Sequence, residues 1–274
     1  MSGERTGTFI ATKEHRRFTE FAEAVRKHRY VGLCYGSAGV GKTLSARRYA
    51  HWELASPVIE ERKGRRDPLR AKVNAALARS RTVFHTPTVV GTLRDLRETL
   101  DDYIVRVDSC IDDHLHRHVK GCRVIEPYDP LVEMLIFDEA ERLSVTALEF
   151  IRDIFDRKGV GVILIGMPGM EKRLSRYPQL YSRVGFAHHY RPLQGDELSF
   201  VLTRHWRKLG LALDEADFTD TQAIASIARI TGGNFRLLHR LFVQIGRILK
   251  INGLSVITDD VVEAARSTLV IGAT

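Results

Sequence analysis

Eight consecutive residues of this chain have the types and spacing that bind phosphate. They match the pattern G-x-x-x-x-G-K-[ST] and are Gly36, Ser37, Ala38, Gly39, Val40, Gly41, Lys42 and Thr43. Glycines let the backbone wrap an anion with its N–H groups pointing inward, and the start of a following helix adds partial positive charge. Lys42 then reaches the β- and γ-phosphates of a nucleoside triphosphate such as ATP, and the Thr43 hydroxyl ligates Mg²⁺.

The sequence around this loop separates a nucleotide site from a plain glycine-rich turn. An apolar run, 30–35, precedes the loop, and a segment with a helical pattern, 44–55, follows it. Strand, glycine loop and helix is the context that a phosphate-binding loop requires. We therefore expect the loop to bind ATP with Mg²⁺.

A second apolar run, 134–137, ends in two acids, Asp138 and Glu139. Such a run is typical of a buried parallel strand, and acids at its carboxyl end lie where open α/β sheets bind ligands. Asp138 is expected to hold Mg²⁺, directly or through water, and Glu139 to orient and polarise the attacking water. The alternative is a strand that runs into an acidic helix N-terminus. The second carboxylate favours hydrolysis over storage of the nucleotide.

Two arginines follow in positions that suit phosphate chemistry. Arg183 lies between two predicted strands, where an arginine of a ring or filament ATPase reaches the γ-phosphate bound by the neighbouring subunit. Arg173 and Arg176 compete for this role, and an exposed arginine of a basic protein is the alternative. Arg236 opens a helix after 231–235, from which it can contact the nucleotide of its own chain.

Alternating strands and helices, followed by helices alone, must position these residues. Besides the segments above, the pattern predicts helices over 13–27, 69–79, 92–103, about 103–120 and 143–157, and strands over 82–86, 161–166 and 186–190. The expected fold is α/β, a parallel-sheet sandwich over 1–192 that includes the N-terminal helix, with a helical lid over 193–274.

Composition limits the classes of function. The chain has 274 residues, a formal net charge of +8 and a sequence pI of about 9.5, which makes nucleic acid a candidate partner without proving it. No apolar run reaches the roughly 18 residues of a membrane span, and the N-terminus is polar. Three cysteines suit a reducing cytoplasm. We expect a cytoplasmic protein with no membrane partner.

With the loop, the acidic strand, Arg183 and Arg236 in this order, the chain resembles AAA+ ATPases. Three stretches, 132–143, 161–168 and 174–184, make it similar to the TniB, TnsC and MuB transposition ATPases, closest to TniB, over about 13–265. The resemblance implies a homo-oligomer that assembles as a filament or ring on target DNA. It also implies that the assembly recruits a DDE-type transposase, with an adaptor as a further candidate partner, and comes apart when ATP is hydrolysed.

The same resemblance places the helix after the second strand along double-stranded DNA. Thr92, Arg94 and Arg97 are the candidate contacts, and a solvated helix face is the alternative. Contacts from arginines and hydroxyls to phosphates give affinity with little choice of sequence. A basic cluster at 62–66 is a second candidate, although such a cluster is more often a soluble loop.

Two departures from the family pattern qualify these expectations. The strand 161–166 usually leads to a polar residue that contacts the γ-phosphate or the water, and Met167 occupies that position. We therefore expect slow hydrolysis, stimulated by DNA or a partner. The segment from about 62 to 129 also matches the family poorly.

Other functions remain open. An AAA+ ATPase of replication initiation, helicase loading or secretion shares these motifs, and a nucleotide switch that hardly hydrolyses ATP is compatible with Met167. A row of cysteines and histidines four residues apart, Cys110, His114, His118 and Cys122, contains metal-ligand types. Four ligands in line on one helix cannot surround a tetrahedral ion, so zinc is disfavoured.

Overall fold

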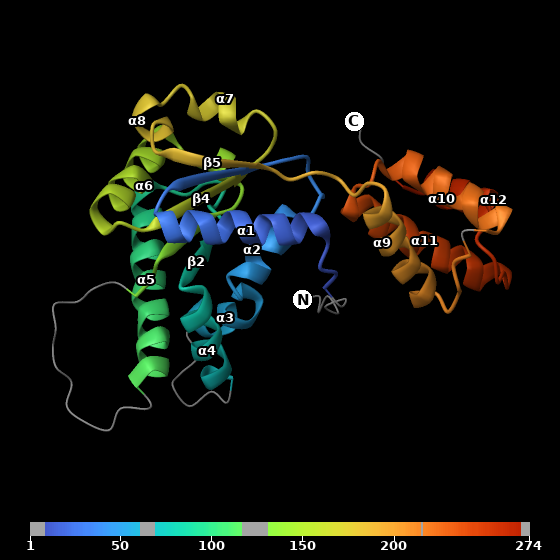
Figure 1. Ribbon diagram of the computed structural model, residues 1–274, viewed down its shortest axis with the longest axis horizontal. Helices are drawn as coiled ribbons and strands as arrows, with labels where there is room; N and C mark the ends of the chain where they lie inside the picture. The colour runs from blue at the N-terminus through green and yellow to red at the C-terminus, as the bar shows by residue number, and fades with distance from the viewer. Residues whose placement is uncertain (1–8, 61–68, 117–130, 215, 270–274) are drawn as a thin grey trace. The chain divides into compact units, whose positions relative to one another are not determined.

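The computed structural model describes residues 9–60, 69–116, 131–214 and 216–269. The chain divides into two compact units, which are described separately. The sheet unit comprises 15–36 and 42–190, and the helical unit comprises 1–14, 37–41 and 191–274 (Figure 1). The basic cluster at 62–66 and two members of the cysteine and histidine row, His118 and Cys122, lie outside the described residues.

Five parallel strands form the centre of the sheet unit, in the order β2-β3-β4-β1-β5. The strands are β1 (Val31–Tyr35), β2 (Thr82–His85), β3 (Met134–Phe137), β4 (Gly161–Gly166) and β5 (Val184–His189). Every residue of β3 and β4 is buried, as their continuous apolar sequences require in a sheet covered on both faces. The predicted α/β parallel-sheet fold is confirmed.

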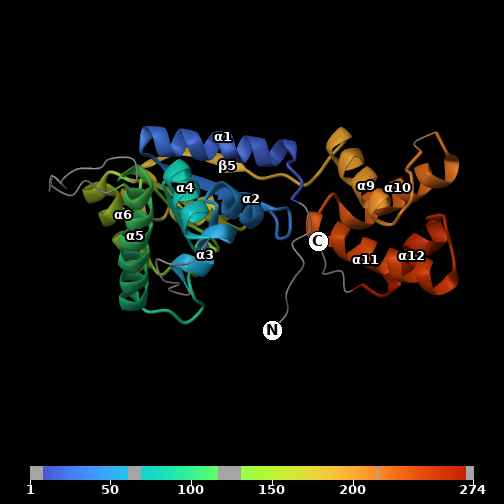
Figure 2. The same cartoon turned by 90° about the horizontal axis from the view of Figure 1, so that it is seen from below.

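Helices cover this sheet and connect its strands. They are α1 (Lys13–His28), α2 (Lys42–Tyr49), α3 (Trp52–Ile59), α4 (Arg70–Ser80), α5 (Leu93–His116), the short 3₁₀ helix η1 (Ala140–Arg142), α6 (Val145–Lys158), α7 (Met170–Leu174) and α8 (Pro178–Tyr181). Figure 2 shows α1 running along the sheet beside β5. The helix approaches β1 so closely that a Cβ on Gly32 would lie 2.5 Å from Val25.

Strand register brings the predicted site residues to one edge of the sheet. Tyr35 at the end of β1 is opposite Gly166 at the end of β4, and Phe137 at the end of β3 is opposite Leu164. The phosphate loop, Asp138 and Met167 therefore all follow the carboxyl ends of neighbouring strands, where α/β sheets bind ligands.

Two helices differ from the prediction. The expected helix 44–55 is interrupted, because His51 adopts a left-handed conformation with φ 52° and separates α2 from α3. No glycine or proline marks this break in the sequence. In contrast, the helix α5 continues through Tyr103, where two helices were expected, because nothing in its sequence interrupts the apolar periodicity.

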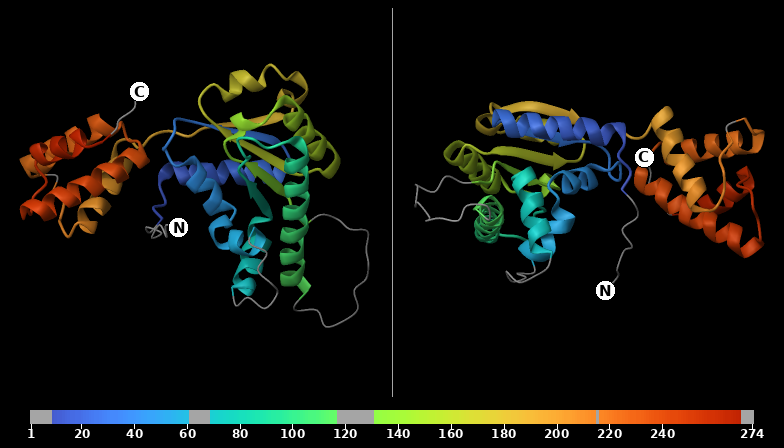
Figure 3. Two further views of the ribbon diagram at one scale, coloured as in Figure 1. Left: turned by 180° about the vertical axis from the view of Figure 1, so that it is seen from behind. Right: turned by 60° about the horizontal axis from the view of Figure 1, so that its bottom comes forward.

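The helical unit is a bundle of α9 (Asp196–Lys208), α10 (Phe218–Thr231), α11 (Phe235–Asn252) and α12 (Asp259–Ser267), seen from behind in the left view of Figure 3. Its core contains Trp206, Leu238 and Ile245, each at most 1% exposed. Asp217, Asn234 and Thr258 cap α10, α11 and α12 through their side-chain oxygens. The N-terminal segment, expected to be loosely ordered up to residue 12, places Ile10 in this core.

Helix length and hydropathy set a limit on membrane insertion. Within the described residues, no helix is both long enough and apolar enough to cross a bilayer.

Candidate functional site

The phosphate loop requires glycine at defined positions. A Cβ on Gly36 would lie 2.3 Å from the Tyr190 carbonyl oxygen, and Gly39 and Gly41 have φ values of 80° and 115°. These are left-handed conformations that side chains other than glycine disfavour. At the loop's end, the Lys42 ammonium donates a hydrogen bond of 2.5 Å to the Gly36 carbonyl. The Lys42 side chain therefore spans the loop whose bound phosphates it is expected to contact.

Within the helical unit, the middle of the loop is held by the start of α11. The Asn234 amide donates to the Ala38 carbonyl at 2.7 Å, and the Arg236 backbone N–H donates to the Gly39 carbonyl at 3.0 Å. The Asn234 side-chain oxygen also accepts from the backbone N–H groups of Arg236 and Leu237. Arg236 therefore begins the helix that anchors the loop. Sequence reasoning missed Asn234, whose bond to Ala38 joins positions 196 residues apart.

Asp138 and Thr43 form the candidate magnesium site. Asp138 is 3% exposed and accepts a hydrogen bond from the Thr43 side chain. Burial raises the pKa of Asp138, and the negative charge of Glu139 adds a smaller rise. Hydrogen bonds from the Thr43 side chain and the Glu139 backbone, together with the positive charge of Lys42, oppose it. A hydroxyl and a carboxylate are hard oxygen donors of the kind that Mg²⁺ prefers, so these residues fit the ion.

Glu139 follows directly and has an unusual backbone. Its φ of 50° and ψ of 44° place it in the left-handed region, which is costly for a side chain with a Cβ. Its carboxylate forms an ion pair with Arg142, and Arg142 also donates to the Pro87 carbonyl at 3.1 Å. The candidate hydrolytic residue is thereby linked to the segment that follows β2. The bond between Arg142 and Pro87 joins positions 55 residues apart, so spacing alone could not identify it.

Arg173, one of the candidates for the intersubunit role, is hydrogen-bonded to backbone carbonyls of its own chain. Its guanidinium donates to the carbonyl oxygens of Glu141, at 2.6 Å, and of Leu143. These carbonyls belong to and follow the short helix η1, so Arg173 fixes the turn behind Asp138 and Glu139.

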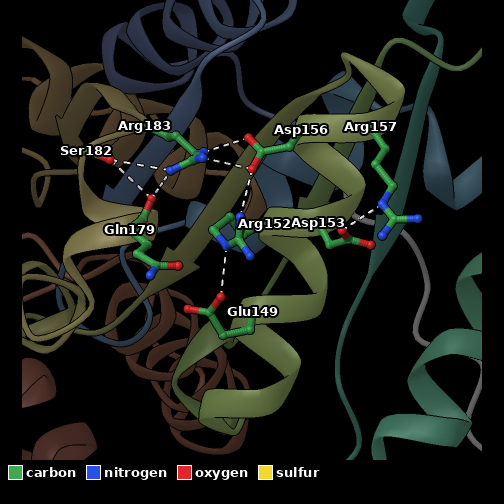
Figure 4. A network of polar contacts seen from close by, with 8 residues as sticks. All are labelled: Glu149, Arg152, Asp153, Asp156, Arg157, Gln179, Ser182 and Arg183. Carbon is green, nitrogen blue, oxygen red and sulfur yellow. Dashed lines mark hydrogen bonds and ion pairs between the residues drawn. The ribbon is translucent and has the colours of Figure 1, made fainter.

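Arg183 lies on the surface of the sheet unit within a network of charges (Figure 4). Its Nε and Nη2 donate to the two carboxylate oxygens of Asp156 at 2.6 and 2.8 Å, while Nη1 donates to the Gln179 carbonyl. Asp156 is also paired with Arg152, and Arg183 lowers the pKa of Asp156. The side chain of Arg183 is 30% exposed. The structure thus shows Arg183 bound by a carboxylate of its own chain.

The candidate DNA contacts begin α5. Thr92 forms a capping arrangement with Asp95, Arg94 pairs with Glu98 at 2.7 Å, and the Arg97 guanidinium lies 5.0 Å from the centre of the Phe150 ring. All three residues are exposed. Thr92 also lines a pocket, whose other lining residues include His85, Pro87, Arg142 and Ser144.

Two further positions were singled out by the sequence. Met167 follows β4 and is 40% exposed, and its thioether offers no strong hydrogen bond to a phosphate or a water. Cys110 of the cysteine and histidine row is buried, and burial raises the pKa of its thiol. Among the described residues, no three histidines, cysteines or acids form a group that could hold a metal ion.

Known proteins resemble this chain in sequence and in fold. A family model described as an AAA domain matches residues 25–174. A Staphylococcus aureus protein described as a potential ATP-binding protein is 44% identical over 269 residues, which cover 96% of this chain and 97% of the relative.

Solved structures resemble the chain at the level of fold alone. The Thermotoga maritima RuvB Holliday junction branch migration motor has a TM-score of 0.55 and 17% identity, covering 93% of this chain and 68% of that one. The ADP form of the Aeropyrum pernix ORC2 protein has a TM-score of 0.52 and 15% identity, covering 96% and 70%. Because the family model matches more than half of the sequence, the chain belongs to the AAA domain family of nucleotide-binding ATPases.

Proposed function

We propose that this ATPase assembles on double-stranded DNA in its ATP-bound form, presents that DNA to a DDE-type transposase, and comes apart when ATP is hydrolysed. The observation that carries the hydrolytic part is the buried Asp138 bonded to Thr43, with Glu139 next to it on the same edge of the sheet. The resemblance of 132–143, 161–168 and 174–184 to TniB supports the role in transposition.

In the proposed reaction, each residue has a separate task. The loop 36–43 surrounds the phosphates, and Lys42 neutralises charge on the β- and γ-phosphates. Thr43 and Asp138 would hold Mg²⁺, which would offset the negative charge of the phosphates. Glu139 orients the attacking water and polarises it toward the γ-phosphorus. Arg236 contacts the same nucleotide from the start of α11.

The proposed hydrolysis is slow in the isolated protein, and DNA or a partner stimulates it. Met167 supplies no polar contact to the γ-phosphate, and the Glu139 carboxylate is engaged by Arg142. A carboxylate in an ion pair is a weaker acceptor for a proton of water than a free one, so Glu139 must leave Arg142 to act. Arg142 is bonded to the Pro87 carbonyl, close in sequence to Thr92, so a partner at this segment would favour that change.

We propose that DNA contacts this segment at Thr92, Arg94 and Arg97. The pair between Arg94 and Glu98 is highly exposed, with 84% and 62% of the two side chains accessible. Exposed pairs are worth only about 0–1 kcal/mol, so a phosphate can replace Glu98 at little cost. Such contacts fix the position of the DNA without reading its bases.

Arg183 is proposed to complete the site of a neighbouring subunit, which predicts complementation between two inactive variants. Arg183→Ala should lower ATP hydrolysis by about 10³-fold, because a guanidinium no longer stabilises the charge of the transferring phosphoryl group. A subunit with Glu139→Gln is expected to bind ATP and assemble without hydrolysing it at a normal rate, and it still carries an intact Arg183. When the two variants are mixed, mixed interfaces should regain measurable phosphate release.

The mixture distinguishes a role between subunits from a role within one chain. Arg157→Ala, which removes an arginine paired with Asp153 on nearby α6, is the matched control and should hydrolyse ATP normally. If Arg183→Ala alone is inactive and the mixture stays inactive, Arg183 acts within its own chain, and the proposed shared site is wrong.

Electron microscopy with duplex DNA and a non-hydrolysable ATP analogue tests the proposed function as a whole. We expect a continuous helical coat or stacked rings on DNA of any sequence, which ATP but not the analogue allows to disperse. Assembly confined to one DNA sequence would indicate a replication initiator instead. No assembly in any nucleotide state would contradict the proposal.

A further inference from the structure

The helix α11 concentrates the positive charge of the chain. Its eighteen residues contain four basic side chains and no acidic one, so it carries +4 of the formal net charge of +8. The basic residues are Arg236, Arg240, Arg247 and Lys250. The other residues of 191–274 comprise six basic and nine acidic ones, so the remainder of this region is net negative. Charge is therefore segregated onto one helix.

These side chains share one face of α11. At about 100° per residue, positions 236, 240, 243, 247 and 250 fall within an arc of about 80°. All five residues are exposed, and Val243 is the single apolar member. The opposite face, with Leu238, Leu241, Phe242, Ile245 and Leu249, is buried in the bundle core. The helix therefore presents a continuous basic stripe, defined here as Arg240, Arg247 and Lys250, with Arg236 at its nucleotide end.

Nothing in the described part of the chain neutralises this stripe. None of its side chains forms an ion pair or a side-chain hydrogen bond with another described residue. Elsewhere in the same unit, arginines are paired: Arg229 binds Glu263 at 2.9 Å, and Arg266 binds the same carboxylate at 3.0 Å. Exposed lysines and arginines usually lie among acids, so an unpaired row of this length is typical of a surface that binds an anionic polymer.

The end of α9, which packs against α11, carries two further basic residues. Leu209 follows α9 and would lie 2.8 Å from a Cβ on Gly246 of α11, and the Trp206 and Phe242 rings are 5.2 Å apart. Arg207 and Lys208, both exposed, lie between these two packed positions in the sequence.

From these observations we propose that the basic stripe on α11 binds the phosphate backbone of double-stranded DNA. From Arg240 to Lys250 the helix rises about 15 Å, comparable with the axial rise of roughly four phosphates on one strand. The segment 92–103, which includes the first part of α5, has two basic and four acidic residues, so the stripe is the stronger source of attraction. The inference rests on the proposed function in taking duplex DNA as the partner.

A membrane surface fits this helix less well. Basic amphipathic helices that adsorb to lipid insert an apolar face beside their charged one. In α11 the apolar face is already buried against the other helices of the bundle, and Val243 alone interrupts the stripe. The stripe can therefore attract phosphates, but α11 has no free apolar face to insert into a bilayer.

A pair of matched double variants tests the stripe. Arg240→Ala/Arg247→Ala removes two unpaired charges, whereas Arg229→Ala/Arg266→Ala removes two paired charges from the same unit. Binding of the full-length proteins to a fluorescent duplex of mixed sequence is followed by anisotropy, with ATP analogue, over a range of salt. We expect the first variant to bind roughly tenfold more weakly, with a salt slope lower by about two, and the control to bind like the wild type.

Each outcome has a defined meaning. Equal binding by both variants and the wild type would overturn the role of the stripe and leave the proposed function intact, as would equal losses in both variants. If the wild type binds no duplex at all, both the inference and the proposed function are contradicted, because each requires binding of double-stranded DNA. Wild-type binding to phosphatidylglycerol–phosphatidylcholine vesicles without binding to DNA would assign the stripe to lipid and overturn the inference. Unchanged ATP binding and melting temperature show that the stripe variant is folded.

Discussion

Replacing Lys42 by alanine is expected to abolish ATP-dependent assembly on DNA. The Lys42 ammonium donates a hydrogen bond to the Gly36 carbonyl across the loop, and under the proposed function it neutralises charge on the bound phosphates. Loss of a charge-assisted contact of about 3 kcal/mol corresponds to a decrease of roughly a hundredfold in affinity for ATP. Titration with a fluorescent ATP analogue measures the affinity, and electron microscopy with duplex DNA measures assembly.

Lysine 42 is buried, so its removal must be separated from a folding defect. Lys42→Met retains the aliphatic stem without the charge and should behave like Lys42→Ala, while both variants keep the wild-type far-UV circular dichroism. Lys158→Ala, at the exposed end of α6, is the control and should assemble normally. Filaments or rings of normal appearance from a folded Lys42→Ala protein would show that the loop 36–43 does not govern assembly.

Replacing Glu139 by glutamine is expected to separate binding of ATP from its hydrolysis. The amide occupies the same volume but cannot accept a proton from water, and removal of a general base costs roughly 10²–10⁴ in rate. ATP affinity should change little, since Lys42, Thr43 and Asp138 remain. The ATP-bound assembly on DNA should therefore persist far longer than that of the wild type, which light scattering after dilution into competitor DNA measures.

A neighbouring residue provides the comparison for this variant. Glu141→Gln alters an exposed carboxylate two positions away and should leave both hydrolysis and disassembly at wild-type rates. Wild-type turnover in Glu139→Gln would exclude Glu139 as the residue that activates water. Slow ATP hydrolysis combined with rapid disassembly would instead show that the release of DNA does not require hydrolysis.

The elements that carry the site could be predicted because their signals are local. The sequences of β3 and β4 are apolar throughout, which is typical of strands buried on both faces, and the glycine pattern of 36–43 encodes a backbone that only glycine adopts easily. Parallel strands end at the same edge, so the meeting of Thr43 and Asp138 followed from the order of the elements.

Pairings between distant residues could not be predicted. The bond from Asn234 to Ala38 and the fork between Arg183 and Asp156 depend on which surfaces meet after folding, and periodicity is silent on that. The break between α2 and α3 occurs at His51, a residue with no strong preference for a left-handed backbone over helix. The local sequence pattern therefore carries no signal for this interruption.

The fork between Arg183 and Asp156 has a consequence for dispersed subunits in a cell rich in ATP. A free subunit under the proposed function has its arginine occupied by a carboxylate of its own, so it neither completes another site nor attracts stray anions to that surface. When a neighbouring subunit binds, Arg183 leaves Asp156 and pairs with the phosphate of that neighbour. The guanidinium therefore has an anionic partner both before and after assembly. Under the proposed function, rapid ATP hydrolysis then requires assembly, because only a neighbouring subunit supplies the second arginine, and no separate inhibitor is needed.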